Sequence, residues 1–199
     1  MVLFDSPVSG NCYKVRLLLA HLGIPYERRF VDAIDRTNRR DELDALNPTR
    51  RVPTLVLEDG RPLGESGAIL LYLGEGTRFV PGDAYERAQM LQWLFFEQAD
   101  HLQSFAVARF IRTFTDRADE LAGRLEQLTK AGHRSLRTME RHLDGREFFV
   151  GADLSLADLA LFAYTHVPHE TGIELEPYPA VRGWVDRVAA VPGHVPMDA

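Results

Sequence analysis

The chain has 199 residues, 45% of them hydrophobic, and a formal net charge of −6, which suits one large folded domain or two small ones. The acidic balance argues against a nucleic-acid-binding surface, and a single cysteine excludes an intramolecular disulfide. No stretch approaches the roughly 18 consecutive apolar residues of a membrane span. Residues 1–5 enter a strand pattern without a basic or long apolar leader. We therefore expect a cytoplasmic protein that binds neither nucleic acid nor membranes.

The first part of the chain, residues 1–76, alternates strand and helix patterns. Residues 2–4 predict a first strand and residues 26–31 a second. Between them, apolar residues recur at i, i+3, i+4 and i+7 and define one buried helix face: Val15, Leu18, Leu19 and Leu22. Gly23 and Pro25 end this helix. Two strands that flank one helix indicate a βαβ unit.

A hairpin is predicted farther along this part. Residues 36–46 first form a weaker, polar helix pattern. Residues 55–63 then predict two short strands, and the Asp59-Gly60 pair between them fits a type I′ turn. Pro62 marks the second strand as an outer one. The next predicted helix, residues 66–73, ends at Gly74.

The second part is helical throughout. Asp83 and Glu86 form a capping-box pattern at the start of a long helix, and Ser155 and Asp158 form another. Helices are predicted over residues 84–102, 121–143, 156–164 and 179–190. The sequence thus predicts an α/β domain over residues 1–76, a linker over 77–82 and an all-α domain over 83–199.

Pro53 stands inside the apolar run of residues 51–57. Proline lacks the N–H that a strand ladder needs, so it belongs at a strand start, an edge or a bulge. A cis Val52-Pro53 bond would turn the main chain of Val52 outward and leave its N–H and C=O free for an extended peptide. Taken alone, Pro53 is explained as well by a simple kink in the strand.

Glu65 and Ser66 stand at the start of the following helix. Glu65 offers an acceptor for an amine, and Ser66 with the free N–H groups of the first turn offers donors for a carboxylate. An ordinary helix start explains the pair equally well when it is taken alone. A site that accepts main chain, amine and carboxylate together fits one end of a small peptide.

A polar loop joins the first strand to the first helix. In α/β sheets, ligands bind beyond the carboxyl ends of strands, where this loop lies. Ser9, Asn11 and Cys12 stand at the helix start, within its N-terminal field. Ordinary turn chemistry is the alternative explanation, because Ser, Gly, Asn and Pro all favour loops.

These segments resemble the cytosolic glutathione transferase superfamily over nearly the whole chain. The resemblance rests on residues 9–15, 47–55, 65–69 and 155–158. It implies a thioredoxin-like N-terminal domain with a cis bond before Pro53, and an all-α domain that supplies the second substrate's pocket. The spacing Ser-x-Asn-x-x-Lys-Val is most similar to bacterial nu-type and theta-like members, which use Ser or Thr with a nearby Asn. The resemblance to the family also implies a homodimer.

The resemblance implies that glutathione is the co-substrate and that Ser9 activates its thiol. A free thiol has a pKa near 8.5, and hydrogen bonds donated to sulfur lower that value. The Ser9 hydroxyl and the Asn11 amide are the expected donors. Cys12 offers a rival mechanism, because a cysteine at a helix N-terminus can form a mixed disulfide with glutathione. The alternative for Cys12 is a small buried hydrophobe.

Further binding residues follow from charge and apolar character. A basic excess comprises Arg39, Arg40, Arg50 and Arg51. Arginine suits carboxylates, so we expect Arg39 and Arg51 at the glycine carboxylate of glutathione, together with Val52, Pro53, Glu65 and Ser66. Phe105, Arg109 and Phe110 are expected to wall the electrophile pocket. No metal site is expected, because Pro168 interrupts the pair of His166 and His169.

The predicted function is therefore a glutathione transferase that acts on a hydrophobic electrophile. Two alternatives stay open: a glutathione-dependent disulfide reductase, and a non-catalytic glutathione-binding protein on the same fold.

Overall fold

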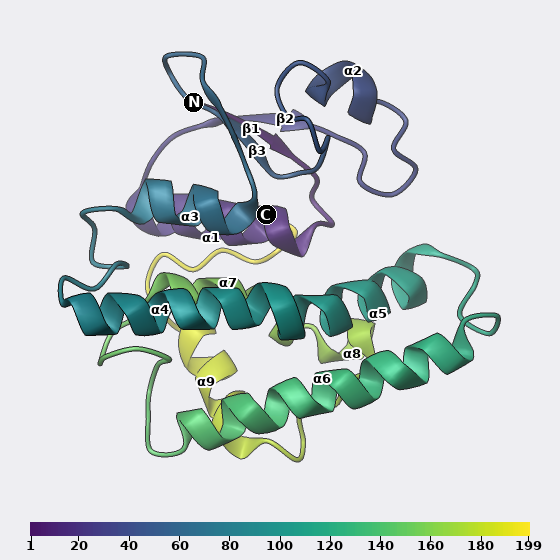
Figure 1. The fold of residues 1–199 in the computed structure, drawn as a ribbon, viewed down its shortest axis with the longest axis vertical. Coiled ribbons are helices and arrows are strands. Elements are labelled where there is room, and N and C mark those ends of the chain that lie inside the picture. Colours follow the sequence, from purple (N-terminus) through teal and green to yellow (C-terminus); the bar gives the residue numbers. More distant parts are fainter. The chain divides into compact units, whose positions relative to one another are not determined.

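The computed structural model describes residues 1–199, which divide into two compact units (Figure 1). The first unit comprises Met1–Thr77 together with Pro192–Ala199, and the second comprises Arg78–Val191. The expected all-α domain, residues 83–199, differs from the second unit at its end, because Pro192–Ala199 packs with the first unit.

The first unit is built on a four-stranded sheet in the order β2-β1-β3-β4. β1 pairs with β2 in parallel and with β3 antiparallel, and β3 pairs antiparallel with β4. Helices α1 and α3 pack against each other (Figure 1). This is the expected thioredoxin-like fold, and it includes the predicted βαβ unit. Its elements are β1 Val2–Asp5, α1 Gly10–Leu22, β2 Glu27–Phe30, α2 Arg39–Leu43, β3 Thr54–Val56, β4 Pro62–Gly64 and α3 Ser66–Gly74.

The hairpin between β3 and β4 turns differently from the prediction. A type I′ turn needs positive φ at both central residues, but only Gly60 has it, at 85°. Gly60 N–H donates to the Leu57 carbonyl, and Leu57 N–H donates to the Arg61 carbonyl. The connection is therefore a three-residue loop with glycine at its left-handed position, a common hairpin alternative.

The predicted helix over residues 36–46 is shorter in the structure because a side chain organises the preceding loop. The Asp32 carboxylate accepts hydrogen bonds from the N–H groups of Ile34, Asp35 and Thr37, and from the Thr37 hydroxyl. These bonds, that of the Thr37 hydroxyl foremost, lower the pKa of Asp32 to about 2. Helix α2 consequently begins only at Arg39.

Side chains of the first unit donate hydrogen bonds to three main-chain carbonyls in the tail of the chain. The Tyr13 hydroxyl donates to the Val195 carbonyl (2.7 Å). Arg16 donates to the Met197 carbonyl (2.5 Å), and its other nitrogen pairs with the buried Asp5 (2.7 Å). Arg28 donates to the Ala199 carbonyl (2.8 Å). Side chains of α1 and β2 therefore hold the tail in place.

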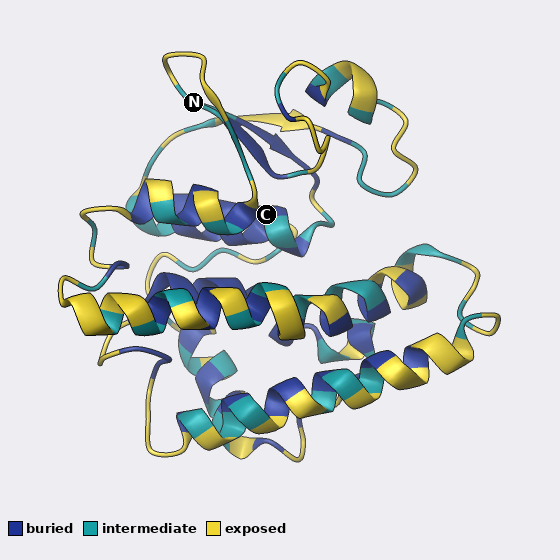
Figure 2. Ribbon diagram, viewed as in Figure 1, coloured by how far each residue is buried: buried dark blue, intermediate teal, exposed yellow.

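The second unit is all-helical, as expected. One helix runs from α4 through a π-helical turn, η1, into α5. The helix predicted here ended at residue 102, so most of α5 was not predicted, and neither were the π-helical turn and the four-residue α8. The most deeply buried helix is α7, whose residues are all buried, whereas α6 alternates buried and exposed positions (Figure 2). The elements are α4 Ala84–Phe96, η1 Glu97–His101, α5 Leu102–Phe114, α6 Ala122–Leu143, α7 Leu156–Thr165, α8 Pro168–Thr171 and α9 Pro179–Ala189.

The predicted cap of α7 is confirmed and does more than end a helix. The Asp158 carboxylate accepts from the N–H and hydroxyl of Ser155, at 2.9 and 2.7 Å. It also accepts from Phe149 N–H (3.0 Å) and from the Trp184 indole (2.9 Å). One buried carboxylate thus joins the start of α7, a loop and α9. None of the helices is both long enough and apolar enough to span a bilayer.

Candidate functional site

Sheet pairing brings three segments of the first unit to one edge. Phe4 near the end of β1 pairs with Thr54 at the start of β3, and Thr54 pairs with Gly64 at the end of β4. The segments beyond these residues are the Ser9 loop, the Val52-Pro53 bond and the Glu65-Ser66 helix start. The predicted site residues of the first part therefore follow adjacent strand ends.

Ser9 is the N-cap of α1. Its φ of −84° is extended, and its Oγ accepts a hydrogen bond from Cys12 N–H at 3.3 Å. The main-chain N–H of Ser9 donates to the Ser6 carbonyl at 3.0 Å, which fixes the loop. Because Oγ acts as acceptor toward the helix, the hydroxyl proton is left for another acceptor at the start of α1.

Asn11 has its amide orientation set by two neighbours. Its Oδ1 accepts from Lys14 Nζ at 2.8 Å and lies 3.5 Å from Ser66 Oγ, which also donates to it. The Nδ2 group forms no hydrogen bond and remains a donor. Lys14, which is fully buried, was not predicted as a site residue. Its signal was the i, i+3 spacing from Asn11 on a helix.

Cys12 does not have the environment of a reactive thiolate. It is fully buried, and burial, with the Asp5 charge adding to it, raises the pKa of its thiol to about 12. Reactive cysteines are exposed and have lowered pKa values. The expectation of a redox role for Cys12 is therefore not supported, and its place is that of a small core residue.

The Val52-Pro53 peptide bond is cis, and the N–H and C=O of Val52 form no hydrogen bond. Asn47 fixes this loop: its Nδ2 donates to the Arg51 carbonyl (3.2 Å) and to Thr54 Oγ1 (2.9 Å). A Cβ on Gly64 would lie 2.9 Å from the same nitrogen. Asn47 was missed as a supporting residue because its role depends on this close approach of β4.

Glu65 is the N-cap of α3 and has a φ of 64°, which is unusual for a residue with a Cβ. Its exposed side chain does not cap the helix, so the carboxylate is available to a ligand. The first main-chain bond of the helix runs from Ile69 N–H to the Glu65 carbonyl at 3.0 Å. The N–H groups before Ile69, including that of the buried Ser66, are open to an anion.

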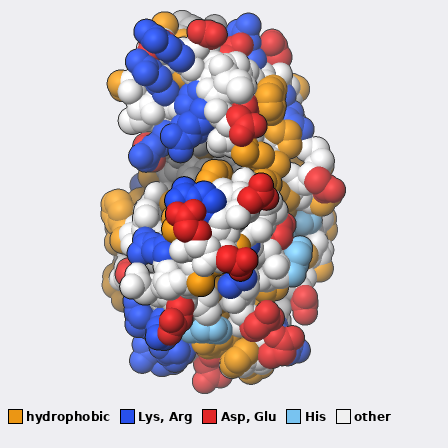
Figure 3. Space-filling view, turned by 90° about the vertical axis from the view of Figure 1, so that its right-hand side faces the viewer, with side chains coloured by type: hydrophobic (Ala, Val, Ile, Leu, Met, Phe, Trp, Pro, Cys, Tyr) orange, Lys and Arg blue, Asp and Glu red, His pale blue; other side chains and the backbone are white.

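Arg36, Arg39 and Arg51 of the first unit form no ion pair with a carboxylate. Burial lowers the pKa of Arg39, and the nearby positive charges of Arg36 and Arg51 lower it further, while the Asp32 charge opposes the shift. The Nε atom of Arg39 is buried without a hydrogen bond. Arg50, by contrast, pairs with Asp44 at 2.5 Å. Lys and Arg side chains gather on the upper part of the face in Figure 3.

The three predicted electrophile-pocket residues lie on α5 in the second unit. Phe105 is fully buried and stacks on His101, with ring centroids 4.1 Å apart; a side chain without accessible surface does not fit a substrate contact. Arg109 is nearly buried and pairs with Glu170 at 2.8 Å. Phe110 is exposed and lies against Phe114. Phe110 is thus the one of the three that is free to meet a substrate.

Comparison with known proteins identifies the family of the chain. Residues 8–75 match the family model for the glutathione S-transferase N-terminal domain, and residues 100–192 match that for the C-terminal domain. A glutathione S-transferase crystal structure from Pseudomonas fluorescens [Pf-5] is 42% identical, with a TM-score of 0.95 and 98% of both chains covered.

Two other relatives have different names. The disulfide-bond oxidoreductase YfcG of Escherichia coli (strain K12) is 28% identical over 96% of this chain and 90% of its own. A structure of Ure2p in complex with glutathione is 28% identical, with a TM-score of 0.86 and coverage of 96% and 95%. The chain belongs to the cytosolic glutathione S-transferase superfamily.

Proposed function

We propose that the protein is a glutathione transferase that ionises the thiol of bound glutathione and directs it at a hydrophobic electrophile. In this reaction the thiol gives its proton to solvent, and the sulfur forms a bond to the electrophilic carbon while the leaving group departs with its electron pair. Relatives named glutathione S-transferase, and Ure2p in complex with glutathione, support glutathione as the ligand.

The main support is the pair of donors at the start of α1. Ser9 Oγ accepts from the helix, and Asn11 Oδ1 accepts from Lys14, so the Ser9 hydroxyl and Asn11 Nδ2 are both able to donate to a sulfur. Hydrogen bonds to an anion stabilise it and lower the pKa of its acid. The helix N-terminus adds a favourable field.

The other contacts account for the ends of the tripeptide. Glu65 suits the amine of the γ-glutamyl group, the open N–H groups of α3 suit its carboxylate, and the unpaired N–H and C=O of Val52 suit the peptide main chain. Arg39 and Arg51 suit the glycine carboxylate. A homodimer in the cytoplasm completes the proposal, as expected for the superfamily.

Substitution of Ser9 tests the proposed ionisation. Ser9→Ala removes a donor, so the pKa of the bound thiol should rise toward the free value of about 8.5. The acid limb of the pH–rate profile for conjugation to an aryl halide should move to higher pH, and kcat at pH 7 should fall by about ten- to a hundredfold. Glutathione affinity should change little, because Ser9 contacts only the sulfur.

Ser9→Thr is the matched control, because it keeps both the hydroxyl and the helix cap. It should retain the wild-type pH–rate profile. A profile that stays unchanged in Ser9→Ala contradicts the role of Ser9.

Glutathione-dependent disulfide reduction is the second candidate, favoured by the similarity to YfcG. There the thiolate would attack a disulfide sulfur, and a second glutathione would release the product as oxidised glutathione. The burial of Cys12 favours a mechanism in which both thiols come from glutathione rather than from the protein. Turnover of a disulfide substrate without turnover of any aryl halide would select this candidate.

A further inference from the structure

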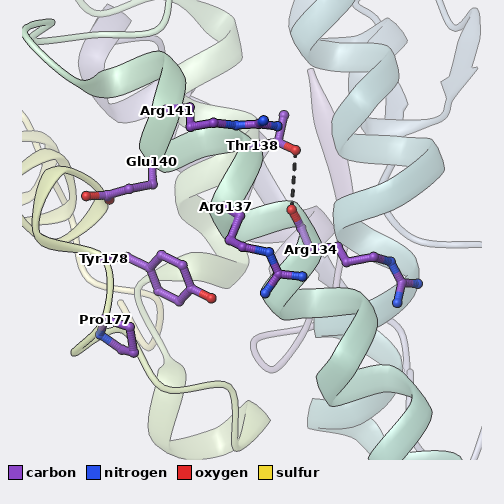
Figure 4. Close-up of a pocket in the computed structure, with 7 residues that line it drawn as sticks. All are labelled: Arg134, Arg137, Thr138, Glu140, Arg141, Pro177 and Tyr178. Carbon is purple, nitrogen blue, oxygen red and sulfur yellow. Dashed lines mark hydrogen bonds between the residues drawn. The ribbon is translucent and has the colours of Figure 1, made fainter.

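A cavity of about 500 Å³ lies beside the C-terminal half of α6, within the second unit (Figure 4). This volume falls in the range of small-molecule sites, about 300–1,000 Å³. None of its lining residues belongs to the proposed glutathione site. The lining residues are Arg134, Arg137, Thr138, Glu140, Arg141, Pro177 and Tyr178.

The cavity carries unneutralised positive charge. Arg134, Arg137 and Arg141 follow one another at i, i+3 and i+7, which places them on one face of α6. All three are exposed, and their guanidinium groups form no ion pair or hydrogen bond. Some other exposed arginines are paired, Arg117 with Glu120 and Arg61 with Asp59. The charge is notable in a chain with a net charge of −6.

The one carboxylate of the cavity is used elsewhere. The two oxygens of Glu140 accept from the N–H groups of Ala180 (3.0 Å) and Val181 (2.9 Å) at the start of α9. Figure 4 shows the Glu140 side chain directed away from the arginines. Glu140 thus caps a helix and forms no ion pair with the arginines, so positive charge predominates in the cavity.

The wall formed by Pro177 and Tyr178 is apolar and fixed. The Tyr178 hydroxyl lies 3.0 Å from His133 Nδ1 and 3.3 Å from the His133 carbonyl, to which it donates. With its hydroxyl engaged, Tyr178 lines the cavity beside Pro177 (Figure 4). The cavity therefore combines exposed cations on one side with an apolar surface on the other, where hydrogen bonds hold Tyr178 in place.

We infer that this cavity binds a small molecule with two or more linked phosphate groups. Guanidinium groups pair with phosphate oxygens through two parallel hydrogen bonds. Residues 134 and 141 are about 10 Å apart along a helix axis, a span that linked phosphates can follow and a single carboxylate cannot. Arg137 and Arg141 are the principal contacts, because Arg134 also lines a neighbouring cavity that contains Asp100.

Calorimetric titration of the whole protein tests this inference. The probes are ATP and inorganic tripolyphosphate, in magnesium-free buffer that contains saturating glutathione to occupy the arginines of the first unit. Saturable binding is expected for at least one probe, and it should weaken as salt is added. Arg137→Gln and Arg141→Gln should each reduce the affinity by about fivefold or more.

Arg124→Gln is the matched control, because Arg124 is an exposed arginine of the same helix outside the cavity. It should leave the affinity within about twofold of wild type. If ATP binds more tightly than tripolyphosphate, the nucleoside contacts the wall formed by Pro177 and Tyr178. If the two bind equally, only the phosphates contribute to binding. Both results support the site. The inference is overturned if neither probe binds at millimolar concentration, or if the cavity variants bind as well as Arg124→Gln does. Because the proposed glutathione site is in the other unit, these results are independent of the conjugation assay.

Discussion

Asn11 depends on a charged neighbour for the orientation of its amide. A free amide can present either its oxygen or its nitrogen to a ligand. Lys14 Nζ at 2.8 Å requires an acceptor, and so the oxygen faces the lysine and the nitrogen is left for glutathione. Lys14 is therefore a positioning residue in the proposed mechanism. It acts through Asn11, and nothing requires it to touch the sulfur.

The reactivity of the Cys12 thiol tests whether this side chain is buried. Because its pKa is raised to about 12 by burial, the native thiol stays protonated from pH 7 to 9. Alkylation by iodoacetamide in the native protein should therefore be slow and should not increase across that range. In denaturant, the rate should rise with pH through the ordinary thiol value of about 8.5. Mass spectrometry of the labelled peptide measures both rates; fast native labelling at pH 8 would contradict the buried assignment.

Among the elements, α7 depends most on a single side chain. Burial raises the pKa of Asp158, while hydrogen bonds from Ser155, Phe149 and Trp184 oppose that shift. Asp158→Ala would leave buried donors without acceptors, each costing about 1–3 kcal/mol. We expect a loss of about 3 kcal/mol or more in the free energy of unfolding, measured with denaturant.

Two further variants serve as controls for the stability loss expected in Asp158→Ala. Asp158→Asn keeps one acceptor oxygen and should lose less stability than Asp158→Ala. Asp153→Ala removes an exposed carboxylate from the turn before α7, and it should change stability by less than about 0.5 kcal/mol. Equal losses in Asp153→Ala and Asp158→Ala would show that the buried hydrogen bonds do not account for the effect.

Element by element, sequence patterns succeed where periodicity and capping are local. The βαβ unit, the long helix α6 and the Ser155–Asp158 cap were all predicted from residues close in the chain. Helix α8 and the π-helical turn were missed because they are too short to show a periodicity. The tail was misassigned because its partners, Tyr13 and Arg16, lie far away in the sequence.

In the candidate site, too, residues in local motifs were predicted, and residues whose role depends on distant contacts were not. Ser9, Asn11, Glu65 and Ser66 stand in recognisable local motifs, whereas the support from Asn47 depends on sheet pairing that brings Gly64 close. Two predicted site residues, Cys12 and Phe105, are fully buried, which does not favour the roles predicted for them. Whether a single side chain is exposed depends on packing across the whole unit, so exposure cannot be predicted from a local sequence motif.

At the scale of the whole molecule, fold and family do not by themselves fix the chemistry. Ure2p has the same architecture, and YfcG is similar in sequence over 96% of this chain, yet neither is named a transferase. What distinguishes a transferase from a simple glutathione-binding protein is the state of the thiol. A catalyst must hold the bound thiol as a thiolate near neutral pH, whereas a binding protein has no such requirement.

Calorimetric titration of glutathione at pH 7, repeated in buffers that differ in ionisation enthalpy, measures both binding and the number of protons released. Free glutathione thiol is almost entirely protonated at this pH, with a pKa near 8.5. If Ser9 and Asn11 lower that pKa to about 6.5 or below, more than about half a proton should be released per glutathione bound. Heat of binding without proton release, or no heat at millimolar glutathione, would contradict the account.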